Sequence, residues 1–264
     1  MDEPKIESPG RTLLVAFLVC LLCSALVSTT AVLLEPRQRA NREREREQGI
    51  LAIVARSPAL AELVDDRAGA SLEARVVELA TGEFADHMDA SSFDARRAAN
   101  DPLLGTDLAP DRDPARLGRR SRFAVVYLVE VDGRTELVIL PIHGGGYAST
   151  IRGYLALAGD TNTVAGLTFF EHGETPGLGA EIDDAEWLES WAGKLVRDDT
   201  GRIRLGIAPD DVAPDSAEAA YQVDGLTGAT RTCDGVNAMV RYWLGEDGFS
   251  PLLARLRRER EESP

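Results

Sequence analysis

The chain has 264 residues, a formal net charge of −15 and 44% hydrophobic residues. This composition allows one or two domains with a sizeable core and excludes disorder of the whole chain. The acidic balance argues against a nucleic-acid partner, because phosphate contacts need clustered Lys and Arg. Three cysteines, two of them in an apolar run, and three scattered histidines exclude a disulfide framework and indicate no metal centre. Any redox chemistry must therefore come from an organic cofactor.

An N-terminal tail, residues 1–11, precedes an uncharged run over residues 12–34. The run is long enough to cross a membrane as a helix. A cleaved signal peptide is the alternative, but its apolar region is shorter, about 7–15 residues. We therefore expect an uncleaved single-pass anchor. Cys20 and Cys23 share one face of it, where they contact lipid or another helix.

The orientation of this anchor is ambiguous from charge alone. Lys5 and Arg11 precede the span, whereas five arginines follow it between residues 37 and 46. The positive-inside rule then favours a cytoplasmic C-terminal part, although long domains do translocate despite flanking charge.

The segment between anchor and domain, residues 35–120, is expected to pack on the domain. Residues 41–65 show helical periodicity and predict a stalk helix. Residues 66–120 are less regular, and residues 94–113 are predicted to be irregular coil.

An antiparallel sheet is predicted from residue 122 onward. Alternating apolar residues indicate strands over residues 123–131 and 136–142, joined at Asp132-Gly133. The glycines at positions 144–146 are expected to break the second strand. Further strands are predicted at residues 153–158, 164–170, 194–196 and 203–207.

Three helices complete the expected α+β domain, residues 121–258. The first is capped by Asp183, the second follows residue 232 and ends at Gly245, and the third opens at Ser250-Pro251. A charged tail, residues 259–264, follows. The expected buried residues of the helices are Trp187, Leu188, Trp191, Val236, Met239, Val240, Trp243, Leu244, Leu252, Leu253 and Leu256.

The sequence DGLTGATRT, residues 224–232, places the hydroxyl of Thr230 on a turn of small residues before a helix. The free N–H groups and the dipole of a helix N-terminus attract phosphate. Gly228 and Ala229 let a bulky group approach the backbone. The alternative is an ordinary loop in which Thr232 caps the helix.

A second segment, EHGETPGLGA at residues 171–180, combines a proline with three glycines. This composition predicts a tight, fixed loop. Taken alone, the loop is also compatible with a plain connection between a strand and a helix.

Together with YWLGEDGFSPLLARLR (242–257), these segments resemble the flavin-binding NqrC subunit of the Na⁺-translocating NADH:quinone reductase. The resemblance implies FMN joined to Thr230 by a phosphoester bond, made outside the cytoplasm by a flavin transferase that takes FMN from FAD. It further implies an electron relay that works with other subunits of a complex coupling quinone reduction by NADH to sodium export. The expected location is the inner membrane, with the large C-terminal domain extracytoplasmic (periplasmic).

The resemblance also implies a cofactor-binding set without catalytic or metal-binding residues. Leu178 is expected to pack on the flavin ring, and Glu174 and Thr175 to hydrogen-bond its edges. Thr232 is a competing hydroxyl, and Asp224 serves either the transferase or the turn. The remaining expected contacts are Gly177, Leu226, Thr227, Gly228 and Ala229.

This chain departs from the family pattern at two places. Thr227 stands where serine is common, and residues 144–149 stand where the family tends to have a tryptophan. Two other interpretations stay open: the FMN-carrying G subunit of an Rnf-type electron-transport complex, and a flavin-free anchored binding domain with a purely structural turn. Direct NADH binding is not expected, since no G-x-G-x-x-G follows a strand.

Overall fold

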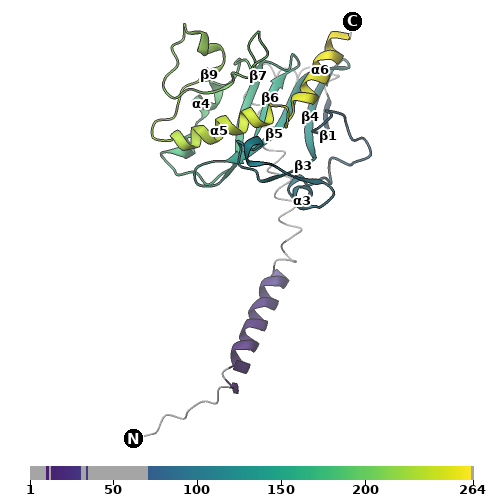
Figure 1. Ribbon diagram of the computed structural model, residues 1–264, viewed down its shortest axis with the longest axis vertical. Helices are drawn as coiled ribbons and strands as arrows, with labels where there is room; N and C mark the ends of the chain where they lie inside the picture. Colours follow the sequence, from purple (N-terminus) through teal and green to yellow (C-terminus); the bar gives the residue numbers. More distant parts are fainter. Residues whose placement is uncertain (1–9, 12, 31–33, 35–70, 263–264) are drawn as a thin grey trace. The chain divides into compact units, whose positions relative to one another are not determined.

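The computed structural model describes residues 10–11, 13–30, 34 and 71–262 (Figure 1). The chain divides into two units, Met1–Gln48 and Gly49–Pro264, each of which is treated by itself. The predicted stalk helix, residues 41–65, lies outside the described residues.

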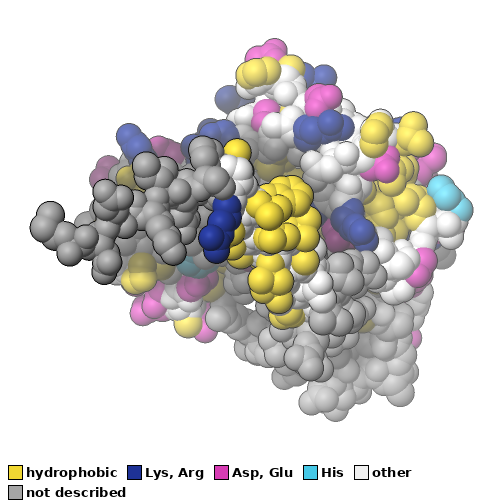
Figure 2. Space-filling view, turned by 90° about the horizontal axis from the view of Figure 1, so that it is seen from below, with side chains coloured by type: hydrophobic (Ala, Val, Ile, Leu, Met, Phe, Trp, Pro, Cys, Tyr) yellow, Lys and Arg dark blue, Asp and Glu magenta, His cyan; other side chains and the backbone are white. Residues whose placement is uncertain are grey.

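In the first unit, Leu13–Thr30 forms a helix that is long and apolar enough to cross a membrane. Figure 2 looks along this helix and shows hydrophobic side chains around it. The Thr30 hydroxyl donates to the carbonyl of Leu26 at 2.7 Å, which satisfies a polar group within an apolar helix. The span predicted over residues 12–34 is thus matched by a candidate membrane helix.

The second unit is built on a five-stranded antiparallel sheet, which confirms the expected α+β class with one apolar N-terminal helix. The strand order is β1-β4-β5-β6-β7. The strands are β1 (Ser71–Glu78), β4 (Phe123–Val131), β5 (Arg134–Gly145), β6 (Thr150–Ala158) and β7 (Val164–Glu171).

The predicted Asp132-Gly133 turn joins β4 to β5. Both residues have positive φ, 51° and 77°, as expected of a two-residue hairpin turn whose twist matches the strands. The strand after it continues to Gly145, so the break predicted at Gly144 is wrong. Gly144 and Gly145 pair with Ile151 and Thr150 of β6.

Two helices cover one face of the sheet: α5 (Thr230–Trp243) and α6 (Ser250–Glu262) (Figure 1). All the residues predicted to be buried on the helices are buried. A shorter helix, α4 (Ala185–Glu189), follows the 3₁₀ turn η2 (Gly179–Asp183). The parallel pair β8 (Gly206–Ile207) and β9 (Gln222–Val223) and the turn η3 (Ala217–Ala220) lead toward α5.

The prediction of irregular coil over residues 94–113 is wrong. This stretch contains α3 (Ala95–Asn100), β2 (Gly105–Asp107) and the 3₁₀ turn η1 (Pro110–Arg112), and β2 pairs with β3 (Arg119–Ser121). The Asp94 carboxylate accepts the N–H groups of Arg96 and Arg97 and thereby starts α3. Upstream, β1 pairs with β4 along its whole length, so the sheet begins before residue 121.

Three smaller predictions also need correction. Asp184, not Asp183, caps α4 by accepting the N–H of Trp187. Of the short strands predicted at residues 194–196 and 203–207, only Gly206–Ile207 is a strand; Leu195 and Ile203 form isolated bridges. Residues 259–262, predicted as a charged tail, belong to α6, and the Arg260 guanidinium donates to the carbonyl of Thr135 at 3.0 Å.

Candidate functional site

The site predicted around Thr230 lies at the start of α5, where Thr230 is the first helical residue and is exposed. The helix therefore begins two residues before the expected start near Thr232, and the alternative in which Thr232 caps it is wrong. Ala229 occupies the capping position, and no side chain in the described part of the chain caps the helix. The first N–H groups of α5 are therefore open to a ligand beside the Thr230 hydroxyl.

The turn before Thr230 is shaped by Gly228. Its φ of +76° favours glycine, and a Cβ there would lie 3.0 Å from Cδ2 of Leu178. The N–H of Ala229 donates to the carbonyl of Leu226 at 3.0 Å. Thr227 is exposed, whereas Leu226 packs against the core. The structure thus places the turn at Gly228 next to Leu178.

The loop that carries Leu178 is tightly turned. The carbonyl of Thr175 accepts the N–H groups of Leu178 and Ala180, and Gly177 has a φ of +74°. As a result Leu178 is held at the surface with 46% of its area exposed.

Across from this loop stands Tyr147, which is 60% exposed. The Arg231 guanidinium lies 5.5 Å from the centre of the Tyr147 ring, within cation–π range. Tyr147 lies in the 144–149 stretch where the family tends to have a tryptophan. Neither Tyr147 nor Arg231 was predicted as a site residue. Tyr147 could have been found from the sequence, because it is the aromatic residue of the 144–149 stretch.

Glu174, only 5% exposed, joins the site's three segments. Its Oε2 accepts the Thr232 hydroxyl at 2.5 Å and the N–H of Tyr147 at 3.2 Å; its Oε1 accepts the N–H groups of Ala148 at 2.9 Å and Ser149 at 3.3 Å. Burial raises the pKa of the Glu174 carboxyl, but these hydrogen bonds outweigh burial and leave that pKa below its usual value. Glu174 is therefore ionised at neutral pH.

Further hydrogen bonds tie the two loops together. The N–H of Gly173 donates to Oγ of Ser149 at 2.6 Å, and that of Glu174 donates to Nδ1 of His172 at 3.2 Å. The proton of His172 then belongs on Nε2, which faces Asp183 at 2.7 Å. The loops at residues 146–149 and 172–179 form one frame around the start of α5.

Glycines allow α5 to approach β5 closely at this frame. A Cβ on Gly235 would lie 2.6 Å from the carbonyl oxygen of Gly145, and one on Gly144 would lie 2.9 Å from Cβ of Met239. A Cβ on Gly146 would lie 2.5 Å from Oε1 of Glu174. The glycine run therefore serves close packing, which brings Thr230 to the loop that follows β5.

Asp224 has a structural role here. Its Oδ1 accepts the N–H of Val212 at 2.7 Å, and its carbonyl accepts Nε1–H of Trp187 at 3.0 Å. These bonds support the turn-forming alternative and connect the turn to α4.

Within the described residues, burial also shifts the pKa values of His143 and Cys233. Burial and the charges of Arg152 and Arg96 lower the pKa of His143 to about 3, so it is neutral at physiological pH. Burial raises the pKa of the Cys233 thiol. Within the described residues, no cluster of three His, Cys, Asp or Glu side chains suits a metal ion.

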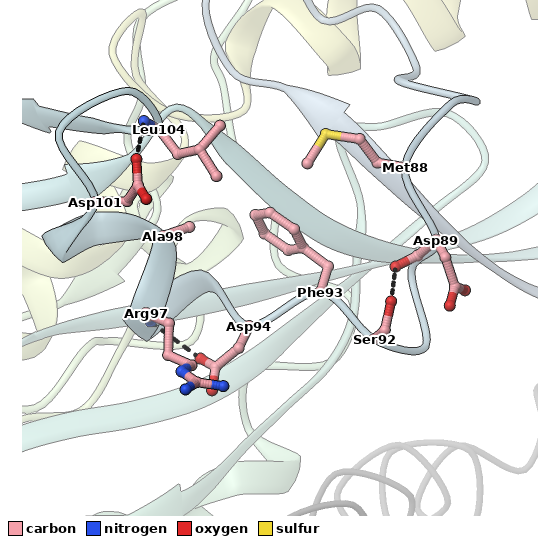
Figure 3. Close-up of a pocket in the computed structure, with 9 residues that line it drawn as sticks. All are labelled: Met88, Asp89, Ser92, Phe93, Asp94, Arg97, Ala98, Asp101 and Leu104. Carbon is pink, nitrogen blue, oxygen red and sulfur yellow. Dashed lines mark hydrogen bonds between the residues drawn. The ribbon is translucent and has the colours of Figure 1, made fainter.

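A separate hollow of about 340 Å³ lies beside α3 (Figure 3). Its apolar lining includes Met88, Phe93 and Leu104. Its carboxylates serve the local backbone: Asp94 caps α3, and Asp101 accepts the N–H groups of Leu103 and Leu104. The carboxylates Asp94 and Asp101 of this hollow are thus used in local hydrogen bonds, and none of the residues that line it belongs to the Thr230 site.

The arrangement at Thr230 fits a phosphorylated flat ring. An uncapped 14-residue helix offers N–H donors to a phosphate, and its first turn contains no acidic residue. Exposed Leu178 and Tyr147 offer apolar and aromatic surface beside it. Gly228, exposed and next to Leu178, leaves the backbone uncovered beside Thr230.

Comparison with known proteins identifies the family of this domain. An FMN-binding domain model matches residues 146–245. The C subunit of the Na(+)-translocating NADH-quinone reductase of Pseudomonas aeruginosa is 45% identical over 258 residues, which cover 96% of this chain and 97% of that protein. The corresponding protein of Yersinia pestis is 39% identical over 264 residues, covering 97% and 96%. The crystal structure of Shewanella oneidensis NqrC superposes with a TM-score of 0.70 at 29% identity, covering 82% of this chain and 99% of that one.

The chain is therefore a protein with an FMN-binding domain that follows a candidate membrane helix. More specifically, it belongs to the NqrC family, the C subunits of the Na⁺-translocating NADH-quinone reductase.

Proposed function

We propose that this chain works as the NqrC subunit of the Na⁺-translocating NADH:quinone reductase. In that complex it carries FMN as an electron relay, and the complex couples quinone reduction by NADH to sodium export. The observation that carries this function is the 45% identity to an NqrC protein over nearly the whole of both chains, together with the FMN-binding domain match over the site. The identity also disfavours the G subunit of an Rnf-type complex. No independent catalysis is expected, since the site holds no acid–base residue poised for it.

The FMN is attached covalently, by a phosphoester bond to Thr230. In the attachment step, Oγ of Thr230 bonds to the FMN phosphorus of FAD and the pyrophosphate bond breaks. AMP leaves with the bridging oxygen, and the hydroxyl proton is released with it. A flavin transferase carries out this step. The exposure of Thr230 and the open N–H groups of α5 support this assignment.

The other predicted FMN contacts are residues that line the site around Thr230. Bound FMN supplies the electron chemistry, and the protein supplies binding and orientation. Leu178 packs against the ring, Gly228 and Ala229 give clearance, and Thr227 offers an exposed hydroxyl. Thr175, Gly177 and Leu226 shape the two turns. Glu174 acts through the loops, since its carboxylate accepts four hydrogen bonds from the protein.

The chain is anchored in the inner membrane by the helix Leu13–Thr30, with its domain on the periplasmic side. The transferase acts on that side, which supports this orientation against the arginine count. Protease added to spheroplasts is expected to digest the domain. Resistance of the domain until the spheroplasts are lysed would refute the orientation.

A fluorescent band on a denaturing gel tests covalent attachment. The full chain, expressed with its transferase, is expected to fluoresce under ultraviolet light, whereas Thr230→Ala is expected to be dark. Thr200→Ala, at an exposed threonine outside the site, serves as a control that keeps the band. A wild-type chain without a fluorescent band would refute covalent flavin attachment. A fluorescent band in Thr230→Ala would show that the flavin is attached to another residue.

A further inference from the structure

Two threonine hydroxyls stand in the first turn of α5, and the structure places them in opposite environments. Thr230 is exposed, whereas Thr232 is only 2% exposed. Both residues are threonines in the same short segment, so chemistry alone does not distinguish them as acceptors of a phosphoryl group.

The difference comes from Glu174. The Thr232 hydroxyl donates its proton to Oε2 of Glu174 at 2.5 Å, and hydrogen bonds to an ionised acceptor are stronger than neutral ones. The same carboxylate is fixed by three backbone N–H groups of residues 147–149. The carboxylate that accepts the Thr232 hydroxyl is therefore held in place by residues outside α5.

The space around the Thr232 hydroxyl is also closed. A Cβ added to Gly179 would lie 2.4 Å from Oγ1 of Thr232 and 3.0 Å from Oε2 of Glu174. Since the position cannot take even one methyl group without movement, it has no room for a phosphoryl group.

We propose that Glu174 determines the site of flavin attachment: it holds the hydroxyl of Thr232 in a buried hydrogen bond and so leaves Thr230 as the acceptor. This inference rests on the covalent attachment proposed above. Glu174 is a positioning residue, because it acts through the Thr232 hydroxyl and the loop at residues 147–149. Glu174 does not change which bonds form and break in the attachment step. It determines only which of the two threonine hydroxyls reacts.

The sequence offers a direct readout of that choice. Trypsin cleaves after Arg204, Arg231 and Arg241 and therefore separates Thr230, on peptide 205–231, from Thr232, on peptide 232–241. Mass spectrometry of the two peptides reports where the flavin is, which a merely structural effect on folding would not move.

The experiment compares Thr230→Val with the double variant Thr230→Val/Glu174→Ala, each as full chain expressed with the flavin transferase. With Glu174 intact, peptide 232–241 is expected to carry no flavin. In the double variant, flavin is expected to appear on that peptide at a level at least about tenfold above the detection limit, the factor that corresponds to the loss of one such hydrogen bond. Thr230→Val/Glu174→Gln keeps the size of the side chain and an amide oxygen that can accept the Thr232 hydroxyl, so it is the matched control and is expected to carry no more flavin on peptide 232–241 than Thr230→Val.

Two results would overturn the inference. The first is flavin on peptide 232–241 in Thr230→Val, since Thr232 would then be available beside an intact Glu174. The second is a folded Thr230→Val/Glu174→Ala variant with no more flavin on that peptide than the single variant. Wild type that carries flavin on neither peptide would refute the proposed function instead, so the two failures are distinguishable.

Discussion

The close approach of α5 to β5 predicts that Gly235→Ala destabilises the domain. In an ordinary helix this change stabilises by about 1 kcal/mol, because alanine has the higher helix propensity. Here the new Cβ would lie 2.6 Å from the carbonyl oxygen of Gly145 and 3.1 Å from Cα of Gly146. Both are backbone atoms, so the helix itself must move.

The expected net effect follows from these opposing terms. Overpacking of a filled core costs about 1–3 kcal/mol, and a clash with backbone belongs at the upper end. After the propensity gain, a loss of about 1–2 kcal/mol remains. For a domain of this size that loss lowers the Tm by roughly 2–8 °C.

Tryptophan fluorescence of the full chain in detergent is a suitable assay. All three tryptophans, at positions 187, 191 and 243, lie in the second unit, so the membrane helix does not contribute. Asp234→Ala, at the exposed neighbouring position, is the matched control and is expected to shift the Tm little. A higher Tm for Gly235→Ala, as in an unconstrained helix, would refute the close packing.

Three further predictions concern other parts of the domain. His143, with its pKa lowered to about 3 by burial and by Arg152 and Arg96, is neutral when folded, so its contribution to stability is complete above about pH 6.5 and falls by up to about 1.4 kcal/mol per pH unit below it. His143→Gln should flatten that acid slope in urea titrations at several pH values, and an unchanged slope would contradict the assignment. Asn237 exchanges two hydrogen bonds with the backbone of Ile207; Asn237→Ala should cost about 2–3 kcal/mol in urea unfolding by leaving that backbone unpaired, and a loss below the error of the measurement would argue against this clamp. Asp94→Ala removes the cap of α3 and should cost about 1 kcal/mol, whereas Asp111→Ala, which caps no helix, should be neutral; equal effects of the two would count against the cap.

The hairpins of the sheet were predictable because their signals are local. Alternation along residues 123–131 and the Asp132-Gly133 pair specify strand and turn within a few residues. The strand β1 was missed because it pairs with β4, about 50 residues later in the chain, and its Leu72 and Glu73 are exposed. The helix α3 has only six residues and begins at a capping Asp within a segment rich in turn residues.

At the site, the turn at Gly228 and the loop at Leu178, both singled out in the sequence, lie together, whereas the hydrogen-bond partners of Thr232 and Glu174 were not predicted. Thr232 satisfies the local rule for a helix cap, yet its hydroxyl donates to Glu174, 58 residues away in sequence. Glu174 was expected at a ring edge, whereas its partners are backbone N–H groups of another loop. The glycine at 144 indicated a break because its neighbour on α5, Met239, is distant in the sequence. Such long-range contacts have no local pattern.

The covalent flavin at Thr230 is the central claim, and mass spectrometry of peptide 205–231 from chain purified out of its native host tests it most directly. We expect a mass increased by that of FMN less one water, with fragment ions that place the addition on Thr230. An unmodified peptide 205–231, recovered from a complex that transfers electrons, would contradict the claim.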